Sequence, residues 1–348
     1  MENITSHDEV TEKSESNKCI NCGSSWIEQG HPTPLCSECR QSFIKFPIPS
    51  VIKIFSLVII AIVFIAMIRL PNNISLGVHE ARGEKALKNK QFLTAQREFK
   101  KVLKESPEYL DAKINSALSS FYVQDYSSML NNLNELEGKK IEDQNLYADL
   151  LNATSQLSSY FPSDSFLAMQ KNYADSSGNI PVNEIQKFVS ANPDDIYASI
   201  ALSSSLFDKK EYLIADTILS NVLNKMPTHL TALALMATLK RELNQFDESI
   251  AYCDKLLSIN RESIYGMSSK SRTYLKMQKD KEALKLALEA REISEDDLYN
   301  LATLAMVYHF NNMIKQRDEI LANAMKDSLS QTYFEFANDV ISNKVKFR

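Results

Sequence analysis

A stretch of apolar residues from Ile48 to Leu70 most constrains what this chain can fold into. Between Lys53 and Arg69 lie 15 residues without a charge, and their large or β-branched side chains would cover every face of a helix. A bilayer core requires about 20 mostly apolar residues, and this length is reached if the Lys53 side chain extends towards the headgroups. The sequence therefore predicts one transmembrane helix over 48–70, which Pro71 ends.

Two other interpretations of this stretch are less favoured. One is a buried core helix of a soluble domain. The other is a cleaved signal peptide, but the apolar run begins only at Ile48 and no small-x-small cleavage site follows it.

Four of the five cysteines precede the apolar stretch and form two pairs, Cys19 with Cys22 and Cys36 with Cys39. The C-x2-C spacing of each pair lets a tight turn place two thiolates on one metal ion, and four thiolates in tetrahedral geometry suit zinc. The residues between the pairs are long enough for a short hairpin, with Trp26 as a small apolar cover. This arrangement resembles a zinc ribbon over 18–47, with one structural zinc ion and no open position for catalysis.

Three alternatives for the cysteines remain open. They are two disulfides, a redox-active C-x-x-C, and a site in which His31 replaces one sulfur. Zinc thiolates persist best in a reducing compartment, which favours a cytoplasmic head and a body on the extracytoplasmic side, as in a bacterial inner-membrane protein facing the periplasm. The positive charges that flank the apolar stretch are nearly balanced and add little.

Composition restricts the rest of the chain. Residues 1–17 are polar and acidic without apolar periodicity, which predicts a disordered tail. Glycine occurs only seven times, and Leu, Ala, Ser, Lys, Glu and Asn dominate after residue 75, which favours helices. The net charge is -5 and there is no basic patch, so nucleic acid is not an expected partner.

A pattern of small, apolar and proline positions recurs every 34 residues in the body, 74–348. Small residues let the two helices of a hairpin approach closely, and proline ends the second helix. The pattern falls on these residues: in 76–109 on Gly83, Ala95, Phe99, Val102 and Pro107; in 196–229 on Ser203, Ala215, Leu219, Val222 and Pro227; in 230–263 on Ala237, Ser249, Cys253 and Leu256; in 264–297 on Ser271, Tyr274, Ala283, Ala287 and Ala290; in 298–331 on Ala305, Tyr308, Leu321 and Ala324. On these residues the body resembles a tetratricopeptide repeat (TPR) array, with Arg317 departing from a small position.

The predicted fold is all-α, a TPR-type solenoid of helical hairpins preceded by one transmembrane helix and a zinc-ribbon-like head. The array is expected to be regular over 196–331 and irregular over 110–195. Within the irregular part we expect a hairpin over 110–137, a helix pair over 143–177 broken near Pro162, and a short helix over 182–190. A capping helix over 332–348 would bury Phe334 and Val340.

Sequence signatures of catalysis are missing. The chain has no H-E-x-x-H, no G-x-S-x-G, no phosphate-binding loop and no dinucleotide fingerprint, and its five histidines are not paired at metal spacing. The acidic pairs Asp194-Asp195 and Asp296-Asp297 are expected to cap helix N-termini, and Cys253 is expected in the core. We therefore predict a protein that is not an enzyme.

The resemblance to TPR proteins implies a concave face that binds proteins or peptides, lined by the first helix of each repeat. Positions two, five and nine of the repeats give the candidate contacts Tyr197, Thr238, Tyr265, Arg272 and Tyr299. Tyrosines at helix starts equally often pack on the preceding hairpin. The Lys and Asn set with which some TPR proteins clamp a C-terminal carboxylate is absent, so that class of ligand is not expected.

These features predict a single-pass, membrane-anchored scaffold or adaptor that supports assembly of an envelope or membrane complex. One alternative is a regulatory or signalling membrane protein whose zinc ribbon contacts a cytosolic macromolecule, although the acidic head disfavours nucleic acid. Another is a substrate adaptor for a membrane protease or transporter.

Overall fold

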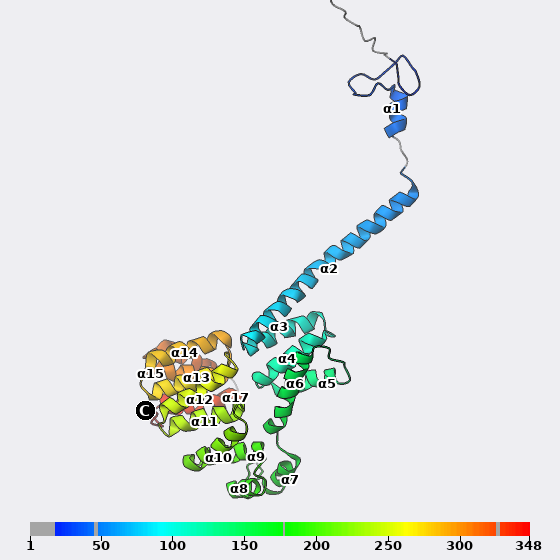
Figure 1. The fold of residues 1–348 in the computed structure, drawn as a ribbon. Helices are drawn as coiled ribbons and strands as arrows, with labels where there is room; N and C mark the ends of the chain where they lie inside the picture. The colour runs from blue at the N-terminus through cyan, green and yellow to red at the C-terminus, as the bar shows by residue number, and fades with distance from the viewer. Residues whose placement is uncertain (1–17, 45–47, 177, 325–327) are drawn as a thin grey trace, which may run out of the picture. The chain divides into compact units, whose positions relative to one another are not determined.

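The computed structural model describes residues 18–44, 48–176, 178–324 and 328–348, except for the side chains at 44, 66, 68–73, 323–324 and 328–329. The prediction of a disordered tail over 1–17 lies outside them. The chain divides into two compact units, 1–71 and 72–348 (Figure 1). Every regular element of the described segments is a helix: α1 Ser37–Ile44, α2 Ser50–Lys88, α3 Phe92–Glu105, α4 Leu110–Tyr122, α5 Tyr126–Leu136, α6 Gln144–Leu157, the 3-10 turn η1 Ser158–Tyr160, α7 Asp164–Tyr173, α8 Val182–Ala191, α9 Ile196–Asp208, α10 Tyr212–Lys225, α11 Leu230–Glu242, α12 Phe246–Ile259, α13 Ile264–Lys276, α14 Asp280–Ile293, α15 Leu298–Phe310, α16 Ile314–Ala324 and α17 Ser328–Ile341.

The helix that contains the apolar stretch is longer than expected. The prediction that Pro71 ends it was wrong, because α2 runs on to Lys88. A proline inside a helix costs about 3 kcal/mol, but the later turns of α2 form the first half of a packed hairpin. In this hairpin Gly83 lies directly against the Phe99 ring and Ala86 is buried. Pro71 removes only its own N–H donor, and the helix continues on both sides of it. Within the described residues, no helix has both the length and the apolar character that crossing a membrane requires.

The repeat of 34 residues is visible in the helix boundaries. The first helices α9, α11, α13 and α15 begin at Ile196, Leu230, Ile264 and Leu298, and the second helices α10, α12, α14 and α16 begin at the same interval. The hairpin turns share one backbone feature, a left-handed residue with φ of 56–63° at Lys210, Asn244, Gln278 and Asn312. None of them is glycine, although this conformation favours glycine.

Each first helix of the regular array starts at a capping side chain. Asp195, His229, Ser263 and Asp297 accept a hydrogen bond from the backbone N–H three residues further on. The predicted capping role is therefore confirmed for Asp195 and Asp297. Asp194, in contrast, forms an ion pair with Lys225 at 2.6 Å.

The small positions of the repeat lie where the two helices of a hairpin touch. Ala95, Ala215, Ser249 and Ala283 are fully buried, as is Cys253, which confirms its predicted place in the core. The Ser249 hydroxyl also donates to the Ala237 carbonyl at 2.7 Å, which joins α12 to α11.

The irregular part contains the expected hairpin of α4 and α5 and the short helix α8. Helices α6 and α7 form within 143–177, but α6 packs on α4 and α7 packs on α8, so the prediction that they form a pair was wrong. At the other end Phe334 and Val340 are buried, as predicted. However, α17 ends at Ile341 and does not reach residue 348. The chain reverses at Asn343 (φ 60°), which buries Phe347 in the core.

Candidate functional site

The first candidate site is the group of four cysteines. Their sulfur atoms all lie within 4.8 Å of one another, as one shared metal ion requires. Cys19 and Cys22 belong to a tight turn that Gly23 closes with a left-handed φ of 74°, and the Gly23 N–H donates to the Cys19 carbonyl at 2.8 Å. Cys36 lies just before α1 and Cys39 in its first turn. His31 is not part of this group.

Backbone hydrogen bonds hold the loop between the two cysteine pairs. Ile20 donates to Pro34 at 3.1 Å and Glu28 donates to Leu35 at 3.0 Å, but residues 18–44 contain no strand. The prediction that Trp26 provides an apolar cover was wrong, because its side chain is 85% exposed. So short a loop has no second layer against which an indole could pack.

The thiols differ in their readiness to ionise. The backbone N–H of Cys36 faces the Cys19 sulfur and lowers the pKa of that thiol to about 6. At Cys39 a hydrogen bond from Asn21 acts in the same direction, but the neighbouring sulfurs of Cys36 and Cys22 outweigh it and raise the pKa to about 12. Four thiolates so close together repel one another unless a cation lies between them, so the donor set fits zinc.

The second candidate site is a cavity of about 530 Å³ in the unit 72–348. One wall comes from the first helices of the repeats and includes Ile200, Ser204, Thr231, Ala234 and Tyr265. All five occupy positions two, five or nine of their repeats, which the TPR resemblance assigns to the concave face. The opposite wall comes from the start of the array, with Leu93, Tyr122 and Gln124.

The array returns on itself to form this opposite wall. Thr94 on α3 donates to the Glu262 carboxylate twice, from its backbone N–H at 2.8 Å and from its hydroxyl at 2.5 Å, across a separation of 168 residues. The Lys90 carbonyl accepts from the Arg261 N–H at 2.9 Å, and Asn260 donates to the Tyr122 carbonyl at 3.2 Å. Repeats of a solenoid ordinarily contact only their neighbours, so these bonds close the concave side.

A second junction joins the irregular part to the regular array. Tyr160 stacks on His229 with ring centroids 4.0 Å apart, and the Tyr160 hydroxyl accepts from the Leu230 N–H at 3.0 Å. His229 is 1% exposed, and its Nε2 lies 3.4 Å from the Ser159 carbonyl oxygen. Burial lowers the pKa of His229 to about 4, so the imidazole is neutral at pH 7.

Four of the five residues predicted to line the groove lie together. The Tyr265 hydroxyl is 2.7 Å from the Thr238 hydroxyl, and the Tyr265 ring stacks on Tyr299 with centroids 4.8 Å apart. The Arg272 guanidinium lies 4.2 Å from the centre of the Tyr299 ring. Tyr197 lies elsewhere, because its ring packs edge-on against Phe166 of α7.

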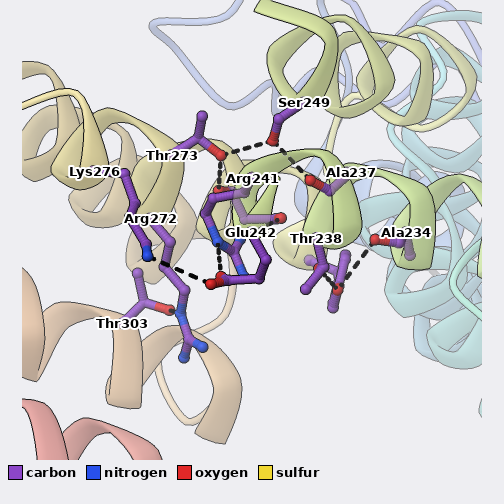
Figure 2. A network of polar contacts seen from close by, with 12 residues as sticks. Ala234, Ala237, Thr238, Arg241, Glu242, Ser249, Arg272, Thr273, Lys276 and Thr303 are labelled. Carbon is purple, nitrogen blue, oxygen red and sulfur yellow. Dashed lines mark hydrogen bonds and ion pairs between the residues drawn. The ribbon is translucent and has the colours of Figure 1, made fainter. Parts of the chain in front are cut away.

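Arg272 belongs to a larger polar network on α11, α13 and α15 (Figure 2). Arg241 Nε and Lys276 Nζ both approach the Glu242 carboxylate, at 3.2 and 3.4 Å. Arg241 also donates to the Ser269 hydroxyl at 3.2 Å, and Arg272 Nε donates to Thr303 at 2.8 Å. Sequence analysis missed Arg241, Glu242 and Lys276, because they lie at the end of a first helix and outside the repeat positions considered.

Comparison with known proteins gives matches of fold only. No known family and no curated protein matches the sequence. Among solved structures, a TPR protein from Parabacteroides merdae is similar at 11% identity and a TM-score of 0.39, over 76% of this chain and 99% of that one. MamA is similar at 14% identity and a TM-score of 0.33, over 47% and 88% of the two chains. YrrB, a TPR protein with an unusual peptide-binding site, is similar at 16% identity and a TM-score of 0.33, over 48% and 88%.

Likenesses this distant concern the fold alone. What supports the likeness to TPR proteins is the chain's own repeat of 34 residues, its buried small positions and its hairpin turns.

Proposed function

We propose that the chain is a scaffold that binds a peptide segment of a partner protein in the cavity on its concave face. The observation that supports this most is the cavity itself, whose 530 Å³ falls within the range of about 300–1,000 Å³ typical of ligand sites. Its walls combine apolar side chains such as Ile200 and Leu235 with hydrogen-bonding groups such as Ser204 and Gln124.

Selection of random peptides on the full chain in detergent micelles tests this function. Peptides that bind the wild-type protein should not bind the Ala234→Trp variant, because the indole fills the space between α11 and α3. Ser204→Tyr is a second variant of the same design. Leu213→Trp adds the same indole at an exposed residue outside the cavity wall and should leave binding unchanged. Equal binding to all variants would mean that the cavity is not the site.

The first half of α2 is proposed as a membrane anchor. Many of its described side chains are apolar and solvent-exposed, with Val51, Phe55, Leu57, Ile60 and Phe64 each more than 60% exposed. Each large apolar side chain gains about 1.5–3 kcal/mol on leaving water, so this surface requires a cover. The apolar segment whose side chains the structure describes is shorter than the roughly 20 residues that cross a bilayer. In the sequence, Ile68 and Leu70 continue this segment.

An alkaline wash of isolated membranes tests the anchor. A spanning helix stays with the membrane, as does a variant with Leu57→Ala. Replacement of Leu57, Ile60 and Phe64 together by Arg should release the chain, because each charge near the centre of a span costs about 2.5–3.5 kcal/mol and each replacement also removes an apolar side chain. Recovery of the wild-type chain in the wash would argue against an anchor.

We further propose that the cysteine head lies in the cytoplasm and that the helical array lies outside it, where it supports assembly of an envelope or membrane complex. The support is chemical, because a four-thiolate zinc site is most stable in a reducing compartment. A reporter that is active only outside the cytoplasm, fused after Arg348, should be active. A reporter that is active only inside should be silent, and the opposite pattern would overturn this orientation.

A further inference from the structure

The polar network on the concave side carries more positive charge than its own carboxylate balances. Arg241, Arg272 and Lys276 are its three cations, and Glu242 is the one carboxylate within ion-pair distance of any of them among the described residues. Arg241 and Lys276 share that carboxylate. Arg272 has no acidic partner in the part of the chain that the structure describes, although it is only 7% exposed. A buried cation without an acidic partner is costly, and a negative group at this place would reduce that cost.

The free donors of Arg272 have a defined direction. Its Nε donates to the Thr303 hydroxyl, and its guanidinium is held over the Tyr299 ring. Its two Nη atoms donate to no residue that the structure describes, and Figure 2 shows them beyond Thr303, away from the network. A guanidinium fixed at Nε presents two parallel N–H groups at its other edge, which matches the two oxygens of a carboxylate.

The network is connected to the proposed peptide site. Tyr265 lines the cavity and stacks on Tyr299, which is the ring that Arg272 contacts. A peptide that fills the cavity and continues along the first helices therefore passes Tyr265 before it reaches Arg272.

We propose that Arg272 binds a carboxylate of the peptide that occupies the concave face. This inference rests on the proposed function and specifies its ligand as an acidic peptide. The carboxylate can come from an Asp or Glu side chain or from the C-terminus of the peptide. We expect a side chain, because a peptide that extends through the cavity continues past Arg272 along α15.

Two random peptide libraries distinguish these sources. In one the peptides are fused at their C-termini and have no free terminal carboxylate, and in the other the C-termini are free. On the full chain, the first library should enrich Asp or Glu at one position of the binding peptides. Enrichment of acidic residues in neither library, or of a bare terminal carboxylate in the second library alone, would overturn the side-chain assignment.

Variants of Arg272 test whether this residue binds the carboxylate of the peptide. On Arg272→Gln the acidic preference should disappear, and peptides selected on the wild-type chain should bind about 10- to 100-fold more weakly. Arg272→Lys keeps the positive charge but loses the two parallel N–H groups, so it should retain part of the preference for acidic peptides. Lys285→Gln removes an exposed charge on α14 and should change nothing. Thermal unfolding of each variant shows whether it is folded.

The outcomes separate this inference from the proposed function. If peptides bind, are blocked by Ala234→Trp and show no acidic preference that depends on Arg272, this inference fails and the peptide site stands. If no peptide is enriched by the wild-type chain, the proposed function fails and this inference fails with it.

Discussion

The return contact between the start of the array and the turn before α13 depends strongly on one side chain. Glu262 is 7% exposed and accepts both the backbone N–H and the hydroxyl of Thr94. Thr94→Val keeps the shape and the backbone hydrogen bond but removes the hydroxyl donor. A hydrogen bond to a charged acceptor contributes about 1.5–3 kcal/mol, so the closed state should lose stability by about that amount relative to a state in which this junction is open.

Hydrogen exchange measures this opening directly. A loss of about 1.5–3 kcal/mol corresponds to exchange roughly 10- to 150-fold faster, provided that the opening is local. The faster amides should lie in 72–105 and 258–263, and those of α15 should be unchanged. Thr217→Val is the matched control, because the Thr217 hydroxyl bonds only within its own exposed helix turn. Unchanged exchange in Thr94→Val, or equal acceleration throughout the array, would refute the idea that this contact closes the cavity.

Three further predictions concern stability and metal content. Stability against urea should fall as the pH drops from 6.5 towards 4, because the unfolded state binds a proton at His229 that the folded state, with a pKa of about 4 for this residue, excludes. The full loss in the free energy of unfolding is about 3 kcal/mol. The dependence of stability on pH should be weaker in His229→Asn, which keeps a capping acceptor. An equal pH dependence in this variant would contradict the role of His229. Gly77→Ala should stabilise the fold by up to about 1 kcal/mol, whereas Gly83→Ala should be less stable than Gly77→Ala by about 1–3 kcal/mol. A Cβ at Gly83 would meet the buried Phe99 ring at 2.8 Å, and nothing lies within 4 Å of one at Gly77, so equal midpoints in urea would contradict this contact. Metal analysis of the full chain should find one zinc ion per chain and much less in Cys36→Ser; disulfides without zinc would overturn the metal site.

The repeat architecture was predictable because its signals are local. Small residues such as Ala215 and Ala283 recur at fixed spacing where two helices touch, and this placed the hairpins of the regular array correctly. The group of four cysteines was equally predictable, because the C-x2-C spacing itself brings the two sulfur atoms of each pair together. Pro71 misled the prediction of the helix end, because a proline removes only one backbone donor and α2 continues on both sides of it.

The closure of the array could not be predicted, because it depends on pairs far apart in sequence. Thr94 and Glu262 carry no motif, and their contact follows from the path of the irregular part between them. The same holds for Tyr160 and His229. For the groove, repeat counting found Arg272 and Tyr299, but it gave no indication that Glu242 is already shared by Arg241 and Lys276.

Site-specific photo-crosslinking tests the central claim, that the closed concave face is the binding site, most directly. A photo-reactive amino acid is placed at Ser204 in the cavity wall or at Leu213, which is 73% exposed and outside that wall. A peptide selected on the full chain should crosslink from position 204 and not from position 213. Crosslinking from 213 alone, or from neither position while the peptide still binds, would contradict the claim.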